Sequence, residues 1–209
     1  MSGPTPSSAR GLTMLELLLA IVVTSFVGLA LSTALTATAR GMTGAGDARS
    51  ALQRAHAAYV RLRAYTDPAL CVFQHDPERG FVVWLDDSRY SGTVNLTEIR
   101  VFWVKPAEGV VTVERVDFPD EWPEEIVGPL DTVVPTGSDA FTAMLDQRAL
   151  GNTTEEVLVD GAEQLELIFS TPDPLDAARF QARLTMDAGT EDAQPVLMAL
   201  GMRAHQKPR

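Results

Sequence analysis

The first pattern along the chain is a long apolar run near its N-terminus. Residues 12–39 (LTMLELLLAIVVTSFVGLALSTALTATA) carry one charge, Glu16, and the 23 residues that follow it carry none. As a helix, those residues measure roughly 34 Å at ~1.5 Å per residue, and a hydrocarbon core is roughly 30 Å thick. The run is also longer than the ~7–15 apolar residues of a cleavable secretory signal. The pattern therefore predicts a helix that spans a bilayer.

An amphipathic helical pattern follows the apolar run. Three glycines weaken residues 41–46 as a helix, because an interior Gly costs ~1 kcal/mol relative to Ala, and we expect a kink or local melting there. Asp47 is a suitable cap for a renewed helix. Pro68 ends the pattern because it disfavours the α conformation at Asp67, so the whole helix should run from about Thr13 to Tyr65. Its apolar stripe, which should pack on a sheet, comprises Ala48, Ala51, Leu52, Ala55, Tyr59 and Leu62.

From residue 67 onward the pattern changes to short runs rich in β-branched and aromatic residues. The turn-like segment 105–109 (KPAEG) predicts a hairpin between two of them. A short helix is expected to begin at Ser138 as its cap and to stop at Gly151, with Phe141, Met144, Leu145 and Ala149 on its buried face. The fold class is therefore α+β, a long N-terminal membrane-spanning helix followed by a β-rich antiparallel head. The predicted strands are 81–85, 98–104, 110–116, 164–170, 179–186 and 196–202.

Composition narrows the class of protein. The formal net charge is −11 and the pI is about 4.6, which argues against a general nucleic-acid binder because such proteins need Lys and Arg to displace counterions. Hydrophobic residues make up 45% of the chain, which predicts a packed core. The single cysteine, Cys71, excludes an intrachain disulfide. It lies in an apolar run, residues 69–73, either as a small buried hydrophobe or as a reactive thiol.

Charge is divided unevenly along the chain. Residues 40–63 contain five Arg and one Asp, whereas residues 64–209 contain 11 basic and 26 acidic residues. One interpretation is that stacked subunits set the basic helix of one copy against the acidic head of another. The other is that the head is simply soluble and acidic.

Glu16 requires an explanation, because a carboxylate deep in a bilayer costs ~2.5–3.5 kcal/mol on insertion scales. One explanation places Glu16 near the interface, in the first turns of the helix, where the macrodipole favours an acid. The other gives the buried carboxylate a cationic partner.

The second explanation agrees with a family resemblance. Residues 11–20 (GLTMLELLLA) resemble the class III signal of type IV pilins and pseudopilins. The resemblance implies that a prepilin peptidase cuts after Gly11 and that Leu12 is then N-methylated. It also implies that Glu16 serves subunit assembly by facing the N-terminal amine of a neighbouring subunit. Leu12 stands where Phe is usual, and Arg10 is the single basic residue of the leader.

Two signals disagree on orientation. Arg40, Arg49 and Arg54 follow the span, and the positive-inside rule would keep that side in the cytoplasm. The resemblance implies a single-pass protein of the bacterial inner membrane, with a cytoplasmic N-terminus and a periplasmic head, and we follow it. The expected organisation is a leader (1–11), a transmembrane half-helix (12–39), an amphipathic half-helix (40–66) and a soluble head (67–209).

The order of elements resembles the minor pseudopilins of type II secretion, particularly the J-type, and the W-type minor pilins. Residues 157–167 (VLVDGAEQLEL) are similar to the stretch before their last strands. The implied function is a minor pseudopilin at or near the tip of a secretion pseudopilus. Its implied partners are other pseudopilins or pilins, the prepilin peptidase and the inner-membrane assembly platform. The presence of Glu16 argues against assignment as the K-type tip subunit, which typically lacks a Glu at this position.

Two other functions remain open. One is a minor pilin of a type IV pilus, which serves adhesion, motility or DNA uptake. The other is a signal-anchored binding domain that never assembles.

We expect no enzymatic activity, cofactor or bound metal. His56, His75 and His205 have no metal-ligand spacing, and no nucleophile elbow is visible. The densest acidic stretch, residues 117–125, either offers oxygens to calcium or forms a solvated or partner-facing loop. Phe118 and Trp122 within it suit either an interface or the core. Its acids are Asp117, Asp120, Glu121, Glu124 and Glu125.

Overall fold

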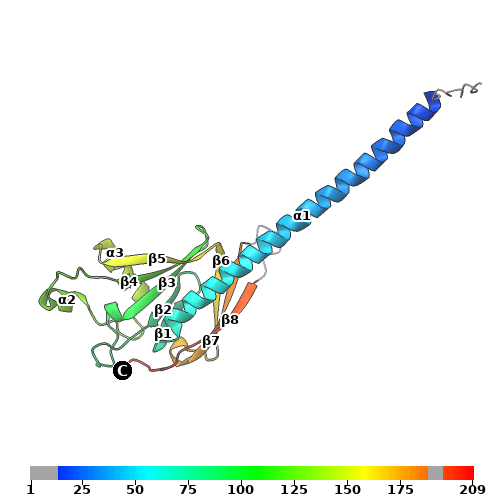
Figure 1. The fold of residues 1–209 in the computed structure, drawn as a ribbon. Helices are drawn as coiled ribbons and strands as arrows, with labels where there is room; N and C mark the ends of the chain where they lie inside the picture. Colours follow the sequence, from blue (N-terminus) through cyan, green and yellow to red (C-terminus); the bar gives the residue numbers. More distant parts are fainter. Residues whose placement is uncertain (1–13, 188–194) are drawn as a thin grey trace, which may run out of the picture. The chain divides into compact units, whose positions relative to one another are not determined.

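The computed structural model describes residues 14–187 and 195–209, with side chains for all of these except residues 37–48. The chain divides into two compact units, one ending at Gly46 and the other running from Asp47 to Arg209 (Figure 1). Helix α1 (Met14–Thr66) passes from the first unit into the second. The α+β fold class predicted from the sequence is confirmed.

Helix α1 is continuous through its glycines. The local melting expected at residues 41–46 is wrong, because the helix is uninterrupted from Met14 to Thr66. Each glycine costs only ~1 kcal/mol, whereas starting a second helix would require a new unfavourable nucleus. The helix ends one residue from the predicted position, just before Asp67 and Pro68. The Asp67 amide still donates to the Arg63 carbonyl at 2.9 Å, which satisfies one of the last carbonyls of the helix.

Two antiparallel sheets form the rest of the second unit. The larger sheet has the order β1-β2-β3-β4-β5 and the smaller has the order β6-β7-β8. The strands are β1 (Cys71–Asp76), β2 (Gly80–Trp84), β3 (Ile99–Lys105), β4 (Val110–Val116), β5 (Thr153–Asp160), β6 (Ala162–Phe169), β7 (Arg179–Met186) and β8 (Pro195–Gly201).

All six predicted strands are present within two residues of their expected ends, and the predicted hairpin is the β3–β4 pair. The sequence did not predict β1 and β5, which are the edge strands of the larger sheet. The polar halves of both strands (QHD in β1 and TTEE in β5) hide the alternation of a half-buried strand. The segment 157–167 spans the end of β5, a turn at Gly161 and most of β6.

The turn between β1 and β2 requires a glycine. Gly80 has a φ of 129°, which side chains rarely adopt, and a Cβ built on it would collide with the Phe102 carbonyl oxygen of β3.

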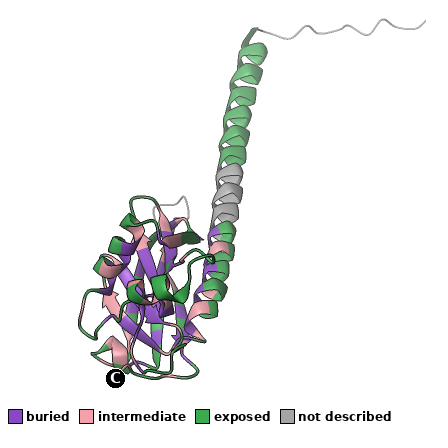
Figure 2. Ribbon diagram, turned by 90° about the vertical axis from the view of Figure 1, so that its left-hand side faces the viewer, coloured by how far each residue is buried: buried purple, intermediate pink, exposed green. Residues whose placement is uncertain are grey.

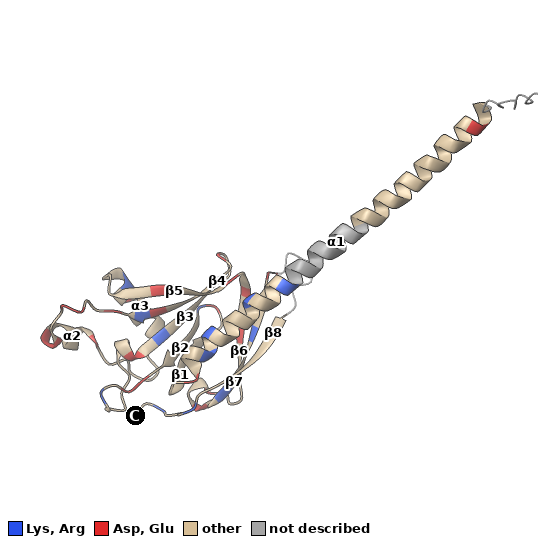
Figure 3. Cartoon of the chain, viewed as in Figure 1, with Lys and Arg blue, Asp and Glu red and all other residues tan. Residues whose placement is uncertain are grey.

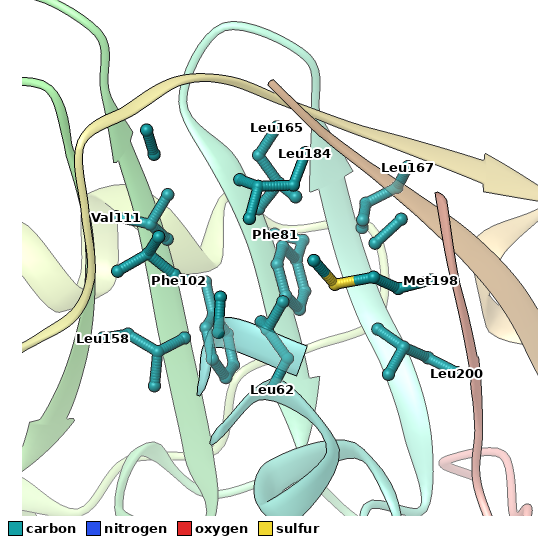
Figure 4. Close-up of a cluster of buried hydrophobic side chains, with 14 of the residues drawn as sticks. Leu62, Phe81, Phe102, Val111, Leu158, Leu165, Leu167, Leu184, Met198 and Leu200 are labelled. Atoms are coloured by element: carbon teal, nitrogen blue, oxygen red, sulfur yellow. The ribbon is translucent and has the colours of Figure 1, made fainter. Parts of the chain in front are cut away.

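Helix α1 contributes four small or aliphatic residues to the main core, at positions 51, 55, 58 and 62. They pack against side chains from both sheets, with the stacked rings of Phe81 and Phe102 at the centre, 4.3 Å apart (Figure 4). Leu52, expected to be buried, is 62% exposed, and Ala58 takes its place. The buried positions 51, 55, 58 and 62 lie on one narrow face of the helix, and Leu52 lies beside that face. Ala48 lies outside the residues whose side chains are described.

The larger sheet is buried on its other face as well (Figure 2). Helix α3 (Ala140–Ala149) covers it with Phe141 and Met144, and the Phe141 ring lies 5.2 Å from that of Trp103. Leu145 and Ala149, expected on the buried face, are exposed, and Gln147 is buried instead. The cap of α3 is Asp139 and not Ser138, because the Asp139 carboxylate accepts from the amides of Phe141 and Thr142.

Three short helices complete the described fold. They are η1 (Leu96–Glu98), α2 (Glu124–Leu130) and η2 (Pro174–Asp176). Helix α2 begins at Glu124, so it takes in only the last two residues of the acidic stretch for which the sequence analysis predicted a loop.

Candidate functional site

The apolar part of α1 carries the candidate assembly residue Glu16. It is the acidic residue of the first turn, and its side chain is exposed (Figure 3). A negative charge in that turn interacts favourably with the positive end of the helix dipole. Gly11 and Leu12, the expected processing residues, and the leader before them lie outside the described residues.

The segment after Glu16 is long and apolar enough to cross a membrane. Residues 14–36 contain an 18-residue window with a mean hydropathy of 2.4, and no part of that window is buried against the rest of the chain. The exposed side chains include Leu17, Val22, Phe26 and Leu31, which point to different sides of the helix. A solvent-exposed helix that is apolar all round is unfavourable in water, and this segment suits either a membrane span or a signal sequence.

Four of the five hydroxyl groups within this segment donate to carbonyl groups of the helix itself. Ser25 donates to the Ile21 carbonyl, Thr33 to the Ala30 carbonyl and Thr36 to the Ser32 carbonyl, each at 2.8 Å. Thr24 donates to the Ala20 carbonyl in the same way. Because the side-chain donors are already used, these four polar residues do not prevent burial of the segment in hydrocarbon.

The acidic stretch presents charge and aromatic surface. Residues 119–126 are all exposed, and the Trp122 ring stacks on that of Phe118 with the ring centres 6.2 Å apart. Asp117 is held at the surface by Thr154, whose hydroxyl donates to its carboxylate at 2.8 Å, and this hydrogen bond lowers the pKa of Asp117. Trp122 therefore lies at the surface, whereas Phe118, which stacks on it, is half-buried and packs against the buried side chains on the face of the larger sheet that α3 covers.

No group of three or more His, Cys, Asp or Glu side chains is placed to hold a metal ion within residues 14–187 and 195–209. The calcium hypothesis for residues 117–125 gains no support from these side chains.

Cys71, His75 and His205 make contacts within the fold, whereas His56 is exposed on α1. Cys71 is fully buried on β1, and burial raises the pKa of its thiol to about 12, so the interpretation as a small buried hydrophobe is confirmed. His75 contacts Phe169 edge-on at 5.2 Å, and burial lowers the pKa of His75. A ring nitrogen of His205 lies 3.0 Å from the Leu175 carbonyl oxygen.

Two helix arginines are engaged within their own unit. Arg54 donates to the Asp187 carbonyl at 2.6 Å, and Arg61 donates to the Leu158 carbonyl at 2.9 Å. These two guanidinium groups tie α1 to the ends of strands. Part of the positive charge that the sequence analysis assigned to contacts between copies therefore holds the fold together.

The sequence analysis missed a surface hollow between α1 and β8. Its apolar end has a volume of about 330 Å³ and is lined in part by Leu52, Tyr59 and Leu197. Its basic end has a volume of about 490 Å³, shares Tyr59 and Ala199 with the first, and contains Arg63, Arg179 and Arg203. We name this surface the α1/β8 groove. It is defined by the side chains of Leu52, Tyr59, Arg63, Arg179, Leu197 and Arg203. The alternation in residues 196–202 could have indicated this surface. It directs Leu197 and Met198 to opposite faces of the strand, and only Met198 is buried.

Comparison of the chain with known protein families, with curated proteins and with solved structures gave no match.

Proposed function

We propose that this protein is a minor pseudopilin subunit, processed by a prepilin peptidase after Gly11 and assembled at or near the tip of a type II secretion pseudopilus. The observation that carries the proposal is one helix with two different surfaces. Residues 14–36 are apolar and uncovered, while residues 51–62 of the same helix pack into the core of an antiparallel β-rich unit. Such a helix joins a membrane segment to a soluble domain without a linker, as an assembling subunit requires.

The pattern at the start of the helix supports the same proposal. Cleavage after Gly11 would create a new amino terminus four residues before Glu16, within about one helical turn. In a helical array, the carboxylate of Glu16 would then pair with the freed amine of a neighbouring subunit. Pairing removes most of the cost of placing each charge among apolar helices. The work of extraction from the membrane would be done by a separate ATP-driven machine, and this chain would supply docking surfaces.

Processing is tested by the intact mass and the N-terminal residue of the protein from membranes, with and without active prepilin peptidase. We expect peptidase-dependent loss of residues 1–11 and an N-methylated Leu12. The Gly11→Leu variant should retain its leader, because a bulky side chain at the position before the cut obstructs the protease cleft. The Glu16→Val variant should be cleaved as the unchanged protein is. A leader that is retained in the presence of the peptidase contradicts the proposal and leaves a fixed signal anchor.

The apparatus is tested separately, because a type IV minor pilin would be processed in the same way. Deletion of the gene should abolish secretion of type II substrates and leave surface pili unchanged. Loss of pili with normal secretion would assign the protein to a type IV pilus instead.

A further inference from the structure

The α1/β8 groove is an exposed surface that combines apolar and basic side chains. Leu52 and Leu197 are 62% and 60% exposed, although each is a large aliphatic residue beside the core. They remain uncovered because β8 is an edge strand of its sheet, and no further strand pairs with it within the described residues. An exposed apolar surface rimmed by charge is typical of a site of protein association.

The basic end of the groove has more positive than negative charge. Arg63 and Arg203 both contact the Asp67 carboxylate, at 3.1 and 3.0 Å, and Arg179 lies beside them. Two guanidinium groups thus share one carboxylate, and a third lies beside them, on a head that is otherwise strongly acidic. A segment that carries several carboxylates next to an apolar anchor has the matching chemistry.

The chain itself contains such a segment. Residues 118–126 (FPDEWPEEI), which we name the acidic segment, expose four carboxylates together with Trp122 at 37% and Ile126 at 48% exposure. Trp is the residue type most typical of an interface anchor, and a Trp side chain buries ~150–250 Å². Its proline residues and the Phe118–Trp122 stack restrict the segment before it binds, which reduces the entropy cost of docking.

The two surfaces cannot meet within one copy. Figure 1 shows α2, which follows Trp122, and β8 at opposite ends of the second unit, and Figure 3 shows red residues at α2 and blue residues along α1 beside β8. A contact in which one copy provides the acidic segment and the next provides the groove is heterologous, and it leaves one unused surface at each end, so it can extend in series.

We propose that the acidic segment of one copy docks in the α1/β8 groove of a second copy. Trp122 enters the apolar end beside Leu52 and Leu197, and the carboxylates of the segment pair with the arginines of the basic end. The contact involves only the unit from Asp47 to Arg209, so it requires neither leader cleavage nor Glu16. It goes beyond the proposed function because it places two or more copies of this subunit next to each other.

The test uses the full-length chain in density-matched detergent micelles, with sedimentation equilibrium over a range of concentrations. We expect concentration-dependent oligomers. Trp122→Ala and Leu197→Glu should each weaken association by about tenfold or more, as loss of an interface anchor does. The matched control is Leu150→Glu, which makes the same change as Leu197→Glu at an exposed position that lines neither the groove nor the acidic segment and should leave association unchanged.

A mixture of the two variants tests the heterologous geometry. Leu197→Glu keeps an intact acidic segment and Trp122→Ala keeps an intact groove, so one interface of full strength is possible between them. The mixture should form dimers but no larger oligomers. Neither variant alone should form dimers at the same concentration. The Trp122→Ala/Leu197→Glu double variant gives the baseline for association through the apolar helix. Equal association of the unchanged protein and the double variant, or no gain on mixing, would overturn the proposal.

Discussion

Glu114 is a fully buried carboxylate on β4, a strand that the sequence predicts correctly. Its oxygens accept from the Trp103 ring nitrogen at 2.6 Å and from the Arg148 guanidinium at 2.6 and 2.8 Å. Arg148 also lies over the Trp103 ring, 5.1 Å from its centre. Three elements, β3, β4 and α3, are therefore joined by one carboxylate, both of whose oxygens accept hydrogen bonds.

We predict that Glu114→Ala lowers the free energy of unfolding by about 3 kcal/mol. The substitution leaves a buried indole N–H and a partly buried guanidinium without their acceptor. Urea denaturation followed by tryptophan fluorescence measures the loss.

Glu166→Ala is the matched control, because Glu166 pairs with Arg183 at 2.9 Å but both side chains are nearly half exposed. That variant should lose ~0–1 kcal/mol. Equal losses for the two variants would show that the Glu114 network contributes no more than a surface pair.

At the scale of elements, α3 depends on its cap. The Asp139 carboxylate accepts from two amides of the first turn and from the Thr142 hydroxyl, and Arg79 donates to it at 2.9 Å. The hydrogen bond from Arg79 is the largest cause that lowers the pKa of Asp139 to about 2, from an ordinary value of 3.8.

Asp139→Ala should therefore destabilise the protein by about 1 kcal/mol near neutral pH, as the loss of a helix cap does. Because the folded pKa is the lower one, the contribution is complete above about pH 4. It is lost as pH falls through about 2, where the folded carboxyl becomes protonated. Thermal unfolding of both proteins between about pH 6 and pH 2 should show the difference shrinking with acidity.

Asp146→Ala, in the exposed middle of α3, is the control for that experiment. It should show little difference from the unchanged protein at any pH in that range. A difference between Asp139→Ala and the unchanged protein that stays constant down to pH 2 would mean that the carboxylate does not act through its charge.

At the scale of the whole molecule, Glu16 and the second unit can be tested independently. We predict that Glu16→Val leaves the fold and the cleavage intact and abolishes incorporation into the assembly, because the freed amine of a neighbour loses its counter-charge. Co-purification with the other subunits of the apparatus measures incorporation. The conservative variant Glu16→Asp should retain part of it, and normal incorporation of Glu16→Val would remove the proposed role of Glu16.

The sequence by itself determined the elements whose signals are local. The apolar run, the end of α1 just before Asp67 and Pro68, the β3–β4 hairpin and six of the eight strands in the described residues follow from composition, periodicity and turn chemistry, which act between residues close in the chain. The α+β class follows from the order of these elements.

Only the tertiary structure decided which faces are covered. Leu52 and Leu145 have the hydrophobicity of core residues but are exposed, while Ala58, Gln147 and Glu114 are buried. Edge strands β1 and β5 exist because a neighbouring strand offers hydrogen bonds, and not because of their own pattern. The α1/β8 groove joins residues more than a hundred positions apart. Burial and pairing depend on contacts between distant segments, and hydrophobic patterning specifies a face without specifying its partner.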